Sequence, residues 1–169
     1  APIGVELDYD WGLDHGTRAV LSAIYPAADV PVVQLSMDAS KPISWHYDVG
    51  RALRPLREHG VLILGSGNVV HTLPQMEWDI NARPHDWAER FNDLVINVVE
   101  TDTPQRLFDH GALGKDAALS VPPADLGHYW PLFYVLGSRL ASDKLTMKPR
   151  HVQYKSLSMV SFVLHSART

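Results

Sequence analysis

Histidine is the side chain with the richest chemistry in this sequence, which contains nine histidines and no cysteine in 169 residues. A neutral imidazole can bind a metal ion, and it can also transfer a proton near pH 7. The lack of cysteine excludes disulfides, thiolate metal sites and thiol nucleophiles, and it fits a reducing cytoplasm. No two histidines have HxH, HxxxH or HExxH spacing, so a metal site must be assembled from segments distant in sequence.

His71 stands in a loop that follows a short apolar run, Val61 to Leu64. The run predicts a buried strand, and open α/β sheets bind ligands at the carboxyl ends of their strands. The intervening Gly65-Ser66-Gly67-Asn68 lacks the third glycine of a dinucleotide loop and the Gly-Lys-Ser/Thr of a phosphate loop. The position favours a functional histidine, and a structural histidine that caps the loop is the alternative.

His128 and His15 stand at the starts of two predicted helices. His128 precedes an apolar helix over 129–140, where a polar group must be hydrogen-bonded or bound to a ligand. It is either a ligand or a hydrogen-bonded core histidine. His15 follows Asp14, which can cap a helix over 16–24 and leave His15 as an exposed first-turn residue.

The other six histidines have weaker patterns. His59 and His110 each precede a glycine and are predicted to lie at the negatively polarised ends of helices. The remaining four lie among polar or terminal residues and are predicted to be solvated: His46, His85, His151 and His165.

Hydrophobic periodicity predicts which elements position these residues. Further helices are expected at 44–60, 86–100 and 103–109, and strands at 30–37, 61–64 and 157–164. Helices and strands therefore mix along the chain without repeats or linkers. The sequence predicts one catalytic-type α/β domain over residues 1–169, a three-layer sandwich with a central mixed sheet and helices on both faces.

Composition limits the partners of this chain. With 46% hydrophobic and 20% charged residues, it has the composition of a globular domain. The net charge is −4 and no basic run is present, so nucleic acid is not expected as a partner. The uncharged apolar stretch 126–138 falls short of the roughly 20 residues that a membrane-spanning helix needs. We expect a cytoplasmic protein without a membrane segment.

Three groups of segments, in this order, carry a resemblance to a known family. They are 12–16 (GLDHG) with 30–38, then 62–73 with its GSGNVVHTL loop, then 128–132 (HYWPL) with 156–162. Together they resemble the class III extradiol ring-cleavage dioxygenases of the DOPA 4,5-dioxygenase type, in the protocatechuate 4,5-dioxygenase superfamily. The resemblance runs from near the first residue to the last predicted strand.

The resemblance implies a mononuclear non-haem Fe(II) site that inserts O2 into a catechol, with a DOPA-like compound as the expected substrate. His128 matches the family's C-terminal metal ligand. His71 matches the loop histidine that acts as acid and base beside the metal and comes within reach of it, and His15 matches a histidine that lines the same pocket. Zn(II) often occupies such sites in purified members, and it has no redox chemistry. The substrate-binding residues are unknown.

The resemblance also implies an N-terminal portion that supplies two more histidine ligands, so this sequence corresponds to about the C-terminal two thirds of the family fold. A homo-oligomer or a separate chain could supply these ligands. Two other functions stay open: a non-catalytic metal- or partner-binding module, and a metal-dependent hydrolase. Catechol-dependent O2 uptake distinguishes the dioxygenase from both.

Overall fold

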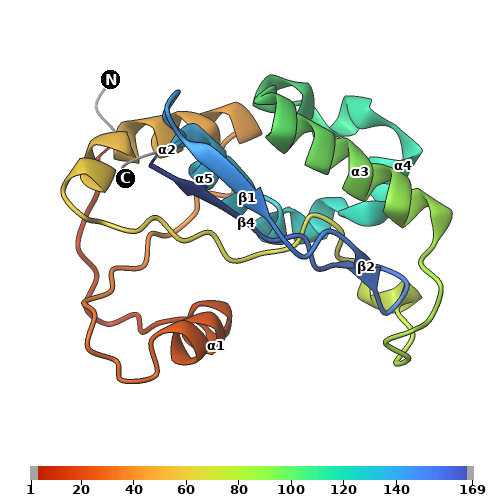
Figure 1. Ribbon diagram of the computed structural model, residues 1–169, viewed down its shortest axis with the longest axis horizontal. Helices are drawn as coiled ribbons and strands as arrows, with labels where there is room; N and C mark the ends of the chain where they lie inside the picture. The colour runs from red at the N-terminus through yellow and green to blue at the C-terminus, as the bar shows by residue number, and fades with distance from the viewer. Residues whose placement is uncertain (1–3, 167–169) are drawn as a thin grey trace. The chain divides into compact units, whose positions relative to one another are not determined.

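The computed structural model describes residues 4–166 (Figure 1). Its internal contacts divide the chain into two compact units, residues 1–38 and 39–169, and each is described by itself. The single-domain organisation therefore stays a prediction. The helices are α1 (His15–Ile24), α2 (Ile43–Glu58), α3 (Asp86–Thr101), α4 (Lys115–Ser120) and α5 (Pro131–Gly137). Short 3-10 helices are η1 (Leu73–Gln75), η2 (Pro104–Leu107), η3 (His110–Leu113) and η4 (Pro123–His128).

The first unit consists of α1 and an extended segment. The Asp14 carboxylate accepts a hydrogen bond from the Thr17 backbone N–H at 2.7 Å, and this bond holds the pKa of Asp14 below its usual value. The strand predicted at 30–37 is wrong for this structure, because the segment is described without strand pairing and Val33 is 88% exposed. The β-branched residues of 30–37 favour an extended backbone, but a strand also needs a neighbouring backbone to pair with.

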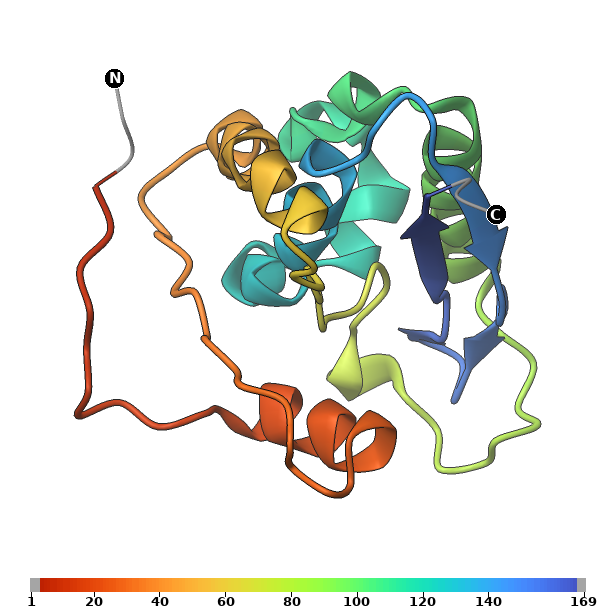
Figure 2. The same cartoon turned by 60° about the vertical axis from the view of Figure 1, so that its left-hand side comes forward.

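In the second unit, α2 and α5 pack against each other at very close range (Figure 2). Gly50 of α2 lies on the backbone of Tyr134, and a Cβ at position 50 would collide with it. A Cβ at Gly137 of α5 would likewise collide with the Tyr47 carbonyl and with Gly50. Only glycine allows this approach, so the crossing of the two helices is fixed at these positions.

The hydrophobic core forms around α3, the helix predicted at 86–100. One face of α3 is buried through Phe91, Val95, Val98 and Val99, which follow the spacing of an amphipathic helix. This face packs against α4 and η2. The predicted helices at 16–24, 44–60 and 86–100 are confirmed as α1, α2 and α3 within a few residues.

The strands form two small antiparallel pairs: β1 (Lys144–Met147) with β4 (Phe162–His165), and β2 (Val152–Gln153) with β3 (Leu157–Ser158). The α/β class is confirmed. The predicted strand 157–164 is divided between β3 and β4, and 61–64 has no strand assignment. Among the described residues there is no central mixed sheet, so the three-layer sandwich stays a prediction.

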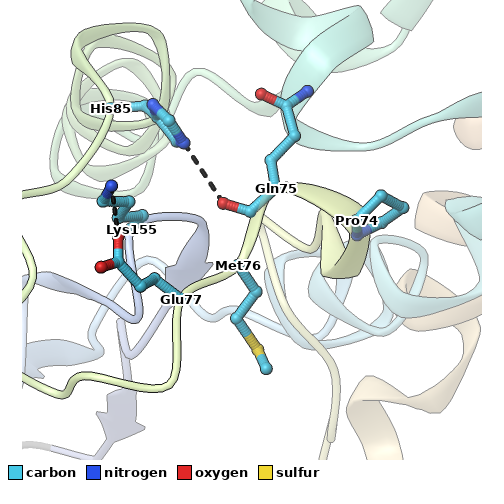
Figure 3. A pocket seen from close by; sticks show the side chains of 6 residues that line it. All are labelled: Pro74, Gln75, Met76, Glu77, His85 and Lys155. Carbon is cyan, nitrogen blue, oxygen red and sulfur yellow. Dashed lines mark hydrogen bonds and ion pairs between the residues drawn. The ribbon is translucent and has the colours of Figure 1, made fainter.

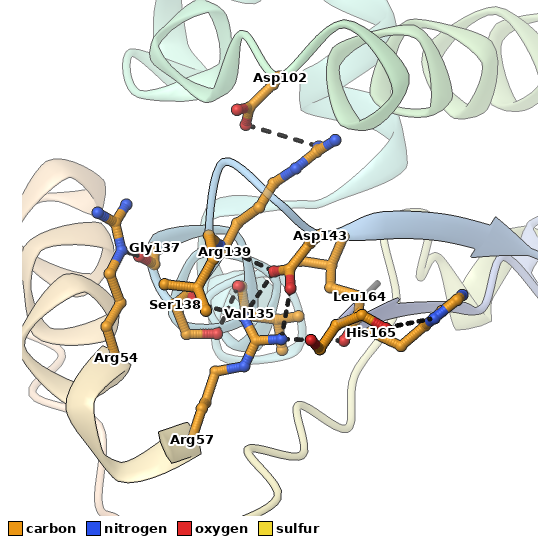
Figure 4. A network of polar contacts seen from close by, with 12 residues as sticks. Arg54, Arg57, Asp102, Val135, Gly137, Ser138, Arg139, Asp143, Leu164 and His165 are labelled. Atoms are coloured by element: carbon orange, nitrogen blue, oxygen red, sulfur yellow. Dashed lines mark hydrogen bonds and ion pairs between the residues drawn. The ribbon is translucent and has the colours of Figure 1, made fainter. Parts of the chain in front are cut away.

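A buried ion pair ties α2 to the end of α5 and to the β1–β4 pair (Figure 4). Arg57 donates two hydrogen bonds to Asp143, at 2.6 and 2.9 Å, and further bonds to the Ser138 and Leu164 carbonyls. Burial alone would raise the pKa of Asp143, but the Arg57 guanidinium and the Leu140 N–H outweigh it, so the pKa is lowered. The charged carboxylate is therefore part of the folded structure.

Asp143→Asn removes the charge that compensates Arg57, whose side chain is only 16% exposed. Because breaking a buried pair strands the remaining charge, we expect the free energy of unfolding to fall by about 3 kcal/mol, measured by urea denaturation. Asp48→Asn is the matched control, since the Asp48–Arg51 pair is more than half exposed and should contribute less than about 0.5 kcal/mol. Equal effects of the two variants would contradict this assignment.

His110 is half-buried at the start of η3, so its predicted position at the end of a helix is wrong. Its ring packs edge-on against Tyr129 at 5.5 Å between centroids and against Phe91 at 6.2 Å. Its Nε2 is buried without a hydrogen-bond partner among the described residues. Burial lowers the pKa of His110, and a hydrogen bond with the Ala117 backbone opposes that shift only in part.

Acid should therefore destabilise the fold through His110. Below the ordinary histidine pKa of about 6.5, His110 binds a proton in the unfolded chain more readily than in the folded chain. The free energy of unfolding therefore falls as pH falls. We expect His110→Phe to lose less stability than the wild type between pH 7.5 and 5.5, by up to about 1 kcal/mol. Urea unfolding of both proteins at the two pH values checks this, and parallel losses in His110→Phe and the wild type would refute it.

Candidate active site

His71 and His128 lie together although 57 positions separate them in sequence. Their rings are stacked, with centroids 3.9 Å apart and planes 24° from parallel. His128 ends η4, just before α5, and His71 forms an isolated antiparallel bridge with Leu157 of β3. The structure therefore brings together the two histidines that the sequence predicts to share a site.

Backbone hydrogen bonds on both sides hold His71 in place. Its N–H donates to the Ser120 carbonyl at 2.7 Å, at the end of α4. The next residue, Thr72, donates its backbone N–H to the Ser156 carbonyl at 3.3 Å and its hydroxyl to the Leu119 carbonyl. His71 thus sits on a backbone pinned between α4 and the β2–β3 hairpin.

The GSGN loop connects the two histidines directly. The Asn68 N–H donates to the His128 carbonyl at 2.8 Å, and its side-chain amide donates to the Ser158 carbonyl at 2.7 Å. Gly67 has no room for a side chain, because a Cβ there would collide with the His128 carbonyl and approach Pro131. Gly67 therefore allows the loop backbone to approach His128 closely.

The surroundings keep His71 neutral. Burial lowers its pKa first, the neighbouring His128 lowers it further, and Asp125 opposes both in part. Its Nδ1 is buried and has no hydrogen-bond partner in the described part of the chain. A neutral imidazole with an unused nitrogen can accept a proton or bind a cation.

The pair fits only part of a metal centre. Among residues 4–166 no group of three or more His, Cys, Asp or Glu side chains could hold an ion. The lone pairs of nearly parallel imidazoles also run side by side and do not converge on one point. This geometry fits one histidine as ligand and the other as a proton acceptor beside it.

Two other histidines complete the comparison with the sequence predictions. His15 is the exposed first residue of α1, in the unit of residues 1–38, and its role stays a prediction. His46 was predicted to be solvated, and this is wrong because its side chain is fully buried in α2. Its spacing from Ile43 and Gly50 puts all three on one helix face, a signal that could have revealed it.

An open pocket of about 270 Å³ lies on the segment that follows His71 (Figure 3). Gln75 accepts a hydrogen bond from His85 Nε2 on its backbone carbonyl at 3.2 Å, and Glu77 pairs with Lys155 at the tip of the β2–β3 hairpin. These contacts fix the chain beyond His71.

Within the described residues, no helix has the length and apolar character needed to cross a membrane.

Known proteins share this sequence pattern. Residues 2–163 match the family described as "Catalytic LigB subunit of aromatic ring-opening dioxygenase". The chain is 42% identical over 168 residues to the "4,5-DOPA dioxygenase extradiol" of Escherichia coli K12, covering 95% of this chain and 60% of that protein. It is 33% identical over 133 residues to the Mirabilis jalapa protein of the same name, covering 79% of this chain and 49% of that one.

A solved structure shares the fold. The crystal structure of an uncharacterized Escherichia coli K12 protein superposes with a TM-score of 0.80 at 39% identity, covering 90% of this chain and 62% of the other. The chain therefore spans about half to three fifths of the length of these relatives.

Gly67→Ala should disturb the histidine pair. The added Cβ would meet the His128 carbonyl, so we expect a loss of about 2 kcal/mol in the free energy of unfolding and shifted His71 and His128 ring resonances in NMR spectra. Gly127→Ala is the matched control, since nothing lies within 4 Å of a Cβ there although it adjoins His128. Unshifted ring resonances in Gly67→Ala would show that the loop does not position the pair.

Proposed function

Because the chain belongs to the LigB family of aromatic ring-opening dioxygenases, we propose that it carries catalytic residues of an extradiol dioxygenase that inserts O2 into a catechol. A DOPA-like catechol is the proposed substrate, as the names of the relatives suggest. The observation that carries the proposal is the stacked pair of His71 and His128, which comes from two of the segments that define the resemblance.

We assign metal binding to His128 and proton transfer to His71. The near-parallel rings favour this division, and the loop and η4 give both side chains fixed backbones. A bound Fe(II) would supply the redox chemistry that lets O2 react with a catechol. Zn(II) bound by the same histidine would not, because Zn(II) has no redox chemistry. His71 as a second nitrogen within reach of the metal stays a prediction.

His71 would remove a phenolic proton from the bound catechol. The lowered pKa keeps its imidazole neutral near pH 7, so it can accept that proton without first losing one. Its buried Nδ1 has no competing hydrogen-bond partner among the described residues. The protonated ring can later return the proton as the ring opens, and the role we propose for His15 is to line the same pocket.

The remaining ligands would come from outside the pair. The extended residues 61–64, which lead into the site, have exposed apolar side chains, with Leu62 61% exposed. Such a segment favours pairing with another strand. We propose that a polypeptide segment outside the described residues pairs with it, builds the sheet of the expected sandwich and completes the metal site.

A metal- or partner-binding module without catalysis is the second candidate. It is favoured by the lack of a third ligand within residues 4–166. This candidate keeps metal binding by His128 but involves no oxygen consumption, so the two functions separate in one experiment.

The test is catechol-dependent O2 uptake by the purified protein loaded anaerobically with Fe(II), with the Zn(II) form as reference. We expect uptake with DOPA only in the iron form. His71→Gln should keep metal affinity within about threefold but lower kcat by about 10²-fold or more, as loss of a general base does. His128→Ala should lose the metal, and His151→Gln, at an exposed site, should match the wild type.

Two results would contradict the proposal. If metal binding depends on His128 but no O2 is consumed, the non-catalytic binding module is the function that remains. Turnover by the zinc form without oxygen would indicate a hydrolase instead.

A further inference from the structure

His46 connects α2 to α5 through a hydrogen bond and through ring contacts. Its side chain is fully buried, and its Nδ1 lies 2.9 Å from the Tyr134 hydroxyl in a hydrogen bond. Its ring stacks on Trp130, with centroids 4.8 Å apart and planes 19° from parallel. Burying an imidazole costs desolvation that an apolar side chain would avoid, so its retention in the core requires a specific reason.

The residue under that stack belongs to the turn that carries His128. Trp130 is the N-cap residue of α5 and stands two positions after His128. Its N–H donates to the Leu126 carbonyl at 3.0 Å, and its own carbonyl accepts from Phe133 at 2.9 Å. The backbone is thus hydrogen-bonded from η4 into α5, so Trp130 and His128 belong to one hydrogen-bonded stretch of chain.

The backbone of α2 that carries His46 is held firmly against α5. Gly50, one turn further along α2, lies against the Tyr134 backbone with no space for a Cβ. Arg54, a further turn along, donates to the Gly137 carbonyl at 2.8 Å at the other end of α5. Because this close crossing fixes α2 against α5, the imidazole of His46 is held against Trp130 from a rigid support.

We propose that His46 is a positioning residue that sets the orientation of the His128 imidazole through Trp130, and thereby the affinity of the site for a divalent metal ion. This inference rests on the proposed function, because it takes His128 as the ligand. His46 itself contacts neither metal nor substrate. Groups hydrogen-bonded to a metal ligand typically change metal affinity by about 10- to 100-fold, and we expect the lower end for support that acts through Trp130.

Three variants separate the hydrogen bond of His46 from its stack on Trp130. His46→Asn keeps a polar atom near the Nδ1 position but removes the ring that stacks on Trp130. His46→Phe keeps a flat ring and loses the hydrogen bond, and Tyr134→Phe removes the same bond from the other side. We expect Zn(II) affinity, measured by competition with a chromophoric chelator, to fall at least tenfold in His46→Asn. It should fall about threefold in each of the other two.

The matched control is His59→Asn, at the exposed C-cap of the same helix, where Nδ1 hydrogen-bonds to the Pro55 carbonyl at 2.9 Å. It should leave the Zn(II) dissociation constant unchanged. Lower thermal stability of His46→Asn with an unchanged dissociation constant would reduce His46 to a packing residue and overturn the inference.

A metal-free readout distinguishes the two proposals. The His71 and His128 ring protons experience each other's ring currents at 3.9 Å, so reorientation of His128 shifts their NMR resonances. We expect larger shifts in His46→Asn, His46→Phe and Tyr134→Phe than in His59→Asn. Unshifted resonances overturn the positioning role. If the variants shift these resonances but the wild-type protein binds no Zn(II), the proposed metal site and the affinity claim are refuted, and only the orienting contact remains.

Discussion

The close crossing of α2 and α5 is the constraint on which the geometry of the site depends. Gly50 and Gly137 let the helix backbones meet, and any Cβ at either position would force them apart. On its other side, α5 receives the loop through Gly65 and Gly67, which lie against Pro131 and the His128 carbonyl. The start of α5 is thus held between α2 and the loop that leads to His71, and this arrangement brings the two imidazoles together.

The helices could be predicted from the sequence because their hydrogen bonds are local. Apolar residues at three- and four-residue spacing gave α2 and α3 within about two residues of their ends. The strands could not be placed in the same way, because a strand's partners are distant. Residues 61–64 are apolar, yet they are mostly exposed and form no ladder within the described chain. The predicted strand 157–164 is divided because β3 pairs with β2 whereas β4 pairs with β1.

The resemblance was enough to predict the pair of His71 and His128. It did not predict the residues that hold this pair in place. Motif order indicated that His71 and His128 share a site, and their stacked rings agree with it. The residues behind the pair lie outside those motifs. His46 was assigned to solvent as one of four histidines among polar or terminal residues, whereas burial depends on which helix face meets α5. Ser120, which accepts the His71 N–H, carries no recognisable signal in the sequence.

Burial gives His71 and His110 the same electrostatic character for different reasons. Both have a lowered pKa and a buried nitrogen without a partner among the described residues. His110 lies against Tyr129, a fully buried side chain whose hydroxyl pKa is raised by burial, so no charged group compensates it there. His71 has Asp125 to oppose the shift and His128 beside it. A proton on His71 therefore has a nearby carboxylate to stabilise it, which a general base needs and a core histidine does not.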